Sequence, residues 1–228
     1  MKRRRPDQID GPKATKIGSA KGSRQEQAPV RPIVAFDFDG TLTTRDSFTG
    51  FLAWRVGSSR YAAGVAAMAP ALLAYLVHRD RGRLKAAAVR RFLGGLSRDE
   101  LDASARHYAD SHARKLLRPD ALEVWKRWQG QGAQMVIVTA SPEPTVAPFA
   151  RGLGCDLLLG TRLEFDGADR LTGRLDGPNC RAEEKVRRLR AVFGPDLRLA
   201  AAYGDTSGDH AMLKLADEAG FKVFKGAP

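Results

Sequence analysis

The stretch from Ile33 to Thr43, IVAFDFDGTLT, constrains the fold more than any other part of the chain. Its first four residues are apolar and β-prone, which predicts a buried strand. Asp37 and Asp39 follow at i, i+2 spacing, which places both side chains on one side of an extended chain. Gly40 then allows the backbone to turn. Two carboxylates at the carboxyl end of a strand predict a site for a divalent cation and a phosphate, although a solvated turn can carry the same residues.

Three later segments extend this pattern. A strand-like MVIVTAS carries Thr139 at its end, CRAEEKVRRL places Lys185 near a helix start, and LAAAYGDTSGD puts Asp205 and Asp209 after another strand. Together with DFDGT, these segments resemble the four motifs of the haloacid dehalogenase superfamily, in the same order and at suitable spacing. The commonest members of that superfamily are magnesium-dependent phosphatases. The resemblance spans Ile33 to about Phe224.

The resemblance implies a role for each matching residue. Asp37 would be the nucleophile that forms an aspartyl-phosphate, and Asp39 would protonate the leaving oxygen and then activate water. Mg²⁺ would be held by Asp37, the backbone carbonyl of Asp39, Asp205 and Asp209. The phosphate would be bound by Thr139, Ala140, Lys185 and Gly40.

Taken from the residues alone, the later motifs have plainer interpretations. GDTSGD, with Asp205 and Asp209, is also typical of an ordinary turn, and Thr139 alone is an ordinary strand-end residue. Lys185 is surrounded by arginines, so a solvated basic helix face competes with a phosphate-binding role. The four histidines have no metal-ligand spacing, and we expect none of them to be catalytic.

A helical insertion is expected directly after the first strand, because no strand signal occurs between Thr43 and Pro119. Asp46 or Ser47 could cap its first helix, and Ser97 with Glu100 forms a capping box for a helix over 97–118. The uncharged stretch Tyr61 to Val77 is at the lower limit of a membrane span, about 17–25 residues. Because Pro70 interrupts it, we expect two short helices that are buried or face a substrate; contact with a membrane surface or a lipid chain is the alternative.

The insertion resembles the mobile cap of the branch that contains phosphoserine phosphatases. Those enzymes carry a Glu nine positions after the nucleophile, where this chain has Asp46, which would contact the substrate. They also carry Ser-Gly-Gly where this chain has Thr139-Ala140-Ser141. A sibling branch with C-type phosphatidylglycerophosphatases is more similar. Its shared features are a long apolar stretch in the cap and the segments Asp46-Ser47-Phe48, Ala140-Ser141-Pro142 and Glu184-Lys185-Val186.

Strands alternate with helices after Pro119, which predicts an α/β fold. We expect a Rossmann-like parallel sheet core with helices on both faces and a helical cap inserted after the first strand. Its strands are expected at 134–138 and 197–203, its helices at 183–193 and 210–219, with a strand pair at 156–175 and a last strand at 221–224. The expected domains are a disordered basic arm at 1–31, an α/β core at 32–46 and 119–228, and a cap at 47–118.

The net charge of +12 favours anionic partners, and half of it lies in Met1 to Arg31, with nine Lys and Arg against three Asp and Glu. Cys155 and Cys180 lack metal-ligand spacing, and reduced thiols are expected. The N-terminus has no apolar core of a secretory signal. We therefore expect a cytoplasmic protein, with peripheral contact at the inner face of the membrane as an open alternative.

The sequence predicts a Mg²⁺-dependent phosphomonoester phosphatase that acts through an aspartyl-phosphate. Its substrate would be a small phosphomonoester or a phospholipid head-group phosphate such as phosphatidylglycerol phosphate. A phosphotransferase that passes the phosphoryl group to an alcohol would use the same residues. The alternative from another class is a non-catalytic basic regulator that binds anionic membrane or nucleic acid, although no nucleic-acid module is recognised.

Overall fold

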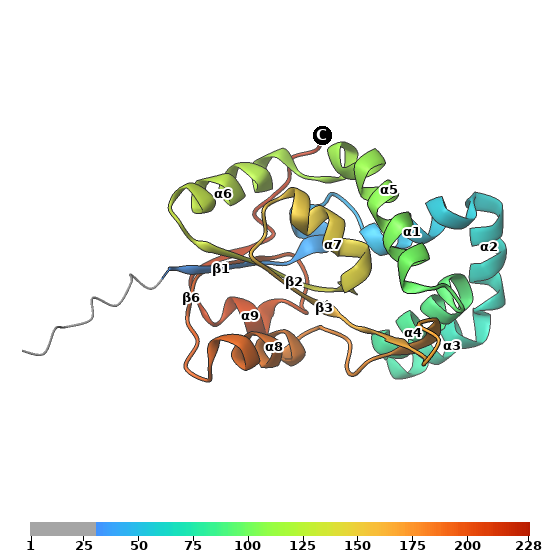
Figure 1. The fold of residues 1–228 in the computed structure, drawn as a ribbon. Coiled ribbons are helices and arrows are strands. Elements are labelled where there is room, and N and C mark those ends of the chain that lie inside the picture. The colour runs from blue at the N-terminus through green and yellow to red at the C-terminus, as the bar shows by residue number, and fades with distance from the viewer. Residues whose placement is uncertain (1–30) are drawn as a thin grey trace, which may run out of the picture. The chain divides into compact units, whose positions relative to one another are not determined.

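The computed structural model describes residues 31–228, and the predicted arm lies outside them except for Arg31 (Figure 1). A five-stranded sheet runs in the order β3-β2-β1-β6-β7, and all its neighbouring strands are parallel. Its strands are β1 (Ile33–Phe36), β2 (Gln134–Pro142), β3 (Leu157–Thr161), β6 (Leu199–Gly204) and β7 (Ala216–Phe221). The predicted parallel α/β core is confirmed.

Apolar side chains cover both faces of this sheet. Along β2, Met135 and Ile137 belong to one hydrophobic core, while Val136 and Val138 belong to a second core on the opposite face. This alternation follows from the two-residue period of a strand, and it buries both faces as a parallel sheet requires. Four helices flank the sheet: α6 (Pro119–Gly130), α7 (Glu143–Gly152), α8 (Glu183–Phe193) and α9 (His210–Leu213).

The segment between β1 and α6 is helical, as predicted. A short turn, η1 (Phe38–Leu42), leaves β1. Five helices follow: α1 (Ser47–Val56), α2 (Ser58–Ala67), α3 (Ala69–His78), α4 (Arg81–Leu93) and α5 (Arg98–Leu116). The side chain of Asp46 caps α1, and Ser97 with Glu100 forms the expected capping box of α5.

The apolar stretch Tyr61 to Val77 forms two helices that meet at Met68, as Pro70 predicts. The pair was expected to be buried or to face a substrate, and the first option is wrong, because α3 has no buried residue and α2 buries only Gly64. One side of the pair lines a cavity and the other side is exposed to solvent. Among residues 31–228, no single helix is long and apolar enough to cross a membrane, while α2 and α3 pass on length and composition only as a pair bent by 58°.

The predicted helix at 210–219 begins at His210 as expected but is too long, and the predicted strand at 221–224 is misplaced. The helix ends at Leu213, and β7 occupies Ala216–Phe221 instead. The sequence ADEAGF contains helix formers, but its backbone pairs in parallel with β6, where Ala201 lies opposite Glu218 and Tyr203 opposite Gly220. Pairing with the edge of the sheet therefore overrides the local preference.

The expected strand pair at 156–175 is only partly correct. Its first strand, β3, joins the main sheet beside β2. The hairpin is instead formed by β4 (Leu163–Phe165) and β5 (Leu171–Leu175), which turn at the predicted DGADR segment. Apolar alternation along the segment does not say which strand a neighbour pairs with, so the sequence could not separate the two sheets.

Candidate active site

The polar residues of the site come from the carboxyl ends of three adjacent strands. Asp37 follows β1, Thr139 lies near the end of β2, and Asp205 follows β6. The strand β1 lies between β2 and β6 in the sheet. From β1 the sheet continues through β2 and β3 on one side and through β6 and β7 on the other, so the strand order reverses at β1. Open α/β sheets form a ligand-binding crevice at such a position.

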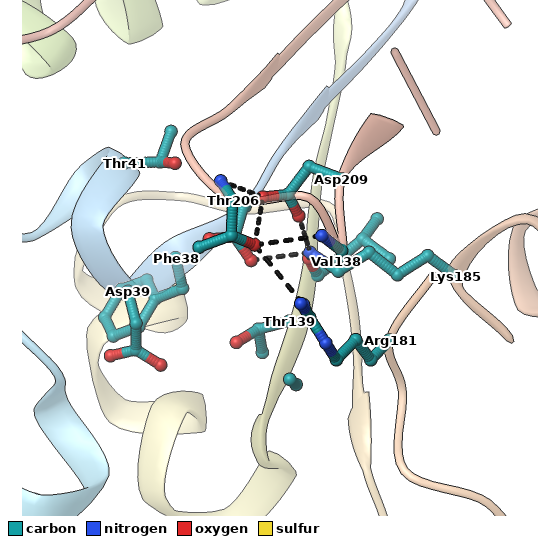
Figure 2. Close-up of polar contacts among 12 residues, drawn as sticks. Phe38, Asp39, Thr41, Val138, Thr139, Arg181, Lys185, Thr206 and Asp209 are labelled. Carbon is teal, nitrogen blue, oxygen red and sulfur yellow. Dashed lines mark hydrogen bonds and ion pairs between the residues drawn. The ribbon is translucent and has the colours of Figure 1, made fainter. Parts of the chain in front are cut away.

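Lys185 connects these strands from the first turn of α8. Its Nζ lies 2.6 Å from Asp37 Oδ1, 2.7 Å from Asp209 Oδ1 and 2.6 Å from the Val138 carbonyl oxygen (Figure 2). Its side chain is only 2% exposed, and the three acceptors match the three protons of an ammonium group. The structure therefore excludes a solvated basic face at Lys185, whereas Arg187 in the same helix is exposed.

Asp209 is held by backbone and side-chain donors in the loop after β6. Its Oδ2 accepts hydrogen bonds from the N–H of Asp205 (3.2 Å), the N–H of Thr206 (2.8 Å) and the hydroxyl of Thr206 (2.9 Å). Burial alone would raise the pKa of Asp209, but Lys185 and these donors hold it below its usual value. Asp209 is therefore a fixed carboxylate.

Asp37, Asp205 and Asp209 each place a carboxylate oxygen within 4.8 Å of the others. Burial raises the pKa of Asp37 to about 7, with Lys185 opposing the rise and Asp209 adding to it. Burial and the charge of Asp209 also raise the pKa of Asp205, whose Oδ1 accepts from the Thr41 hydroxyl at 3.3 Å. With all three carboxylates ionised and Lys185 as the single ammonium, the cluster has a net charge of −2. A group of carboxylate oxygens with this charge suits the divalent cation Mg²⁺.

Gly40 allows the turn after β1 to approach this cluster. Its φ is 85°, a conformation that favours glycine, and a Cβ placed there would lie 2.2 Å from Asp205 Oδ2. Its N–H, predicted to bind phosphate, donates to the Thr43 hydroxyl at 3.3 Å in this structure.

Asp39 lies beside this cluster but has different partners. Its Oδ2 accepts from the Ser141 hydroxyl at 2.5 Å, and its Oδ1 accepts from the backbone N–H of Ser47 at 2.6 Å. In Figure 2 its carboxylate points away from Lys185 and Asp209. Burial, reinforced by the charge of Asp46, raises its pKa. Asp39 can therefore hold a proton at a pH where an exposed aspartate would not.

Asp46 has a structural role at the same place. Its Oδ1 accepts from the Thr49 N–H at 2.7 Å and from the Thr49 hydroxyl at 2.9 Å, which caps α1. The residue also lines the cavity in front of Asp39. The structure thus places this predicted substrate residue at the cavity wall and gives it a second role that the sequence also indicated.

The end of β2 is held by a local hydrogen-bond network. The Ser141 N–H donates to the Thr139 hydroxyl at 3.0 Å, and the Thr161 hydroxyl donates to the Ala140 carbonyl at 2.6 Å. Thr139 is buried, but it lines the cavity together with Ala140. The predicted phosphate-binding residues of β2 therefore lie beside Asp37 and Lys185.

Two cationic residues at the site were missed by the sequence analysis. Lys85, from α4, donates its Nζ to the Ala140 carbonyl, and burial lowers its pKa to about 8 against the opposing charges of Asp39 and Asp46. Arg181 donates to the hydroxyl of Ser207 at 3.0 Å. Lys85 lies in a stretch dense in Arg, Lys and Ala, and nothing in its spacing distinguishes it from the solvated cations around it.

All these groups meet at a cavity of about 730 Å³. Its polar end contains the carboxylates, Thr139 and the lysines described above. Its opposite wall is apolar and comes from the inserted helices: Phe48, Leu52, Tyr61, Val65, Met68, Leu72, Tyr75, Leu84, Ala88 and Phe92. A ligand in this cavity would contact charged groups at one end and apolar side chains at the other.

Comparisons with known proteins identify the family. Residues 34–214 match the family model HAD, haloacid dehalogenase-like hydrolase. Protein CicA of Caulobacter vibrioides is 60% identical over 196 residues, which cover 86% of this chain and 88% of CicA. The chain belongs to the haloacid dehalogenase-like hydrolase family.

Solved structures agree with this assignment. A protein of unknown function from Bordetella pertussis Tohama I has a TM-score of 0.69 and 25% identity, over 83% of this chain and 88% of that one. A substrate-bound phosphoserine phosphatase has a TM-score of 0.52 and 20% identity, over 83% and 84%, and this likeness shows the fold alone. The predicted family, the α/β fold class and an enzyme of the phosphatase type are confirmed at the level of family and fold.

Proposed function

We propose that this protein hydrolyses a phosphomonoester through an aspartyl-phosphate formed on Asp37. The observation that carries the proposal is the contact of Lys185 with Asp37 and Asp209, because it fixes a nucleophilic carboxylate beside a cation and a metal-binding cluster. A phosphoryl group and an attacking carboxylate are both negative. Positive groups fixed in advance reduce that repulsion in the transition state.

Asp37 would attack phosphorus, forming one P–O bond as the bond to the leaving oxygen breaks. Asp39 would give its proton to that oxygen, which its raised pKa supports. Water would then attack the aspartyl-phosphate, with Asp39 taking a proton from the water and Asp37 leaving as a carboxylate. Ser141 and Ser47 would hold the Asp39 carboxyl in place for both steps.

Asp37, Asp205, Asp209 and the backbone carbonyl of Asp39 would hold Mg²⁺. When bound, the ion would supply positive charge to the phosphoryl oxygens. Thr139 and the backbone of Ala140 would bind the same oxygens. Lys185 would favour the ionised form of Asp37, since its ammonium opposes the rise in pKa that burial causes.

The five inserted helices would form a cap over the site. Their apolar wall indicates a substrate with an apolar body attached to its phosphate. A phospholipid head-group phosphate such as phosphatidylglycerol phosphate fits this description better than phosphoserine, but a small phosphomonoester with an apolar group fits as well. A cytoplasmic location with contact at the inner face of the membrane is part of the same proposal.

Two other functions would use the same chain. In a phosphotransferase, an alcohol would replace water in the second step, and alcohol added to the assay would yield a new phosphomonoester. In a non-catalytic regulator, the basic arm at 1–30 would carry the effect. Its deletion would then abolish the biological effect, and Asp37→Asn would leave the effect intact.

The test is release of phosphate from a panel of phosphomonoesters, including phosphoserine, phosphatidylglycerol phosphate and a short alkyl phosphate, with Mg²⁺ or with chelator. The proposal expects Mg²⁺-dependent release that falls at least ~10³-fold in Asp37→Asn. Val192→Gln, which alters an exposed residue of α8, is the control for handling and folding. Turnover by Asp37→Asn equal to that of the control would contradict the proposal.

A further inference from the structure

The outer face of α3 exposes a cluster of large apolar side chains. Leu73, Leu76 and Val77 are 63%, 58% and 76% exposed. Their i, i+3, i+4 spacing puts them on one side of the helix. Among residues 31–228, the other exposed large apolar residues are Val192 (53%), Phe221 (41%) and Val223 (53%), which are all less exposed and lie far along the chain.

This cluster is not required by the cavity. The opposite sides of α2 and α3 line the cavity through Tyr61, Val65, Met68, Leu72 and Tyr75. The helix pair is therefore apolar on two sides, of which only one contacts the rest of the described chain. Figure 1 shows α2 and α3 at the right-hand end of the ribbon, away from the main sheet. The outer face is thus accessible to a large partner.

Basic side chains flank the exposed cluster. Arg79, Arg81 and Arg83 follow the end of α3, and all three are exposed. Asp80 lies in the same segment and pairs with Arg83 at 3.3 Å. Three arginines against one aspartate give this end of α3 a local charge of about +2. An apolar helix face with a cationic rim is typical of segments that lie in the interface of an anionic membrane.

We propose that the outer face of α3 docks this protein on an anionic phospholipid surface. Leu73, Leu76 and Val77 would enter the boundary between head groups and acyl chains, and the arginine rim would contact lipid phosphates. The charge of the rim favours a lipid surface over an apolar protein partner, because phosphates are dense there. Docking assigns a surface of this chain to the membrane contact in the proposed function and rests on that part of it, but it does not depend on the hydrolysis.

The test is co-flotation of the full chain with vesicles of phosphatidylcholine, with and without phosphatidylglycerol. Leu76→Gln/Val77→Gln removes the apolar contact without changing charge, and Val192→Gln/Val223→Gln is the matched double control. We expect at least about tenfold weaker binding of the first variant to phosphatidylglycerol vesicles and less than about twofold change in the control. Arg79→Gln/Arg83→Gln should bind with a smaller preference for phosphatidylglycerol and weaker salt dependence.

Each alternative outcome is distinguishable. Equal binding of the two double variants would overturn the proposal and assign vesicle binding to the basic arm. No binding of the unaltered protein to either vesicle would also overturn it and leave a protein partner as the occupant of α3. Circular dichroism and turnover of a soluble alkyl phosphate are measured on every variant. Normal turnover with lost flotation separates this proposal from the proposed hydrolysis.

Discussion

Lys185 Nζ lies 2.6 Å from Asp37 Oδ1 and 2.7 Å from Asp209 Oδ1, so one buried ammonium joins the first motif of the chain to the last. The two aspartates are far apart in sequence and belong to loops that follow different strands. Burial would lower the pKa of Lys185, but the two carboxylates raise it above its usual value. The lysine therefore stays charged across the pH range in which an enzyme works.

Lys185→Met should destabilise the protein and abolish turnover. It leaves Asp37 and Asp209 buried without their cation, and removing one partner of a buried ion pair costs about 3–5 kcal/mol. Urea unfolding measures the free energy of unfolding, and phosphate release measures activity.

Arg187→Met on the same helix is the matched control. Arg187 is exposed and pairs with Glu184, so its loss should cost no more than about 1 kcal/mol. If the two substitutions lowered the free energy of unfolding equally, the buried contacts of Lys185 would contribute no more to stability than an exposed ion pair.

The metal-free protein should lose stability as the pH rises from about 4 to about 7. Asp37 has a folded pKa of about 7, above its ordinary unfolded value near 4, so the folded state binds more protons in this window. The raised pKa values of Asp39 and Asp205 act in the same direction. The lowered pKa of Asp209 acts below this window, and the raised pKa of Lys185 acts above it.

Mg²⁺ should oppose this loss, because it binds the ionised carboxylates. Thermal melts in chelator and in Mg²⁺ would show a stabilisation by the ion that is larger at about pH 8 than at about pH 5. Asp205→Asn should reduce the shift at about pH 8. A Mg²⁺ shift that is independent of pH, or intact in Asp205→Asn, would disagree with the assigned ligands.

Lys85→Met should lower kcat/KM about tenfold or more and change the alkaline side of its pH profile. Lys85 contacts the Ala140 carbonyl at the phosphate end of the cavity, and its pKa of about 8 means that it loses its charge near that pH. The substitution should therefore remove any fall in activity centred near pH 8. Arg83→Met, which alters an exposed cation on the same helix, should leave the profile unchanged.

The variants Asp46→Asn and Asp46→Ala should separate two roles of Asp46, which caps α1 and whose charge raises the pKa of Asp39. Asparagine caps helices as well as aspartate does, whereas alanine costs about 1 kcal/mol. Asp46→Ala should therefore lower the free energy of unfolding, and Asp46→Asn should leave it nearly unchanged. Both remove the charge that raises the pKa of Asp39, so both should shift the pH dependence of turnover to lower pH. An unshifted profile in both variants would show that Asp46 does not influence the acid.

The sequence predicted the parts of the fold that carry local signals. The strand before Asp37, the helix over Glu183–Phe193 and the capping box at Ser97 depend on periodicity and capping chemistry, which act within a few residues. The prediction for the segment after Leu213 was wrong, because ADEAGF forms a strand only through its pairing with β6. Local preference carries no information about that partner.

The site also combines residues that the sequence predicted with residues that only the three-dimensional structure revealed. The resemblance to four ordered motifs predicted that Asp37, Thr139, Lys185, Asp205 and Asp209 would lie together. Four of them lie at or after the carboxyl ends of neighbouring strands, and Lys185 joins them from α8. Lys85 was missed because it reaches the site from α4, and the packing of an inserted helix on the sheet cannot be deduced from its composition. The two-sided apolar character of α2 and α3 also became visible only in three dimensions.

The central claim is tested most directly by locating the phosphoryl group on the enzyme. An aryl phosphate whose leaving group needs no proton is mixed with Asp39→Asn in Mg²⁺, quenched in acid and mapped by peptide mass spectrometry. Because this variant lacks the group that activates water, the intermediate should accumulate on Asp37, within the peptide that contains 33–43. Turnover of the substrate with a phosphoryl group on another residue, or with no phosphoryl group on the protein at any time, would contradict the account.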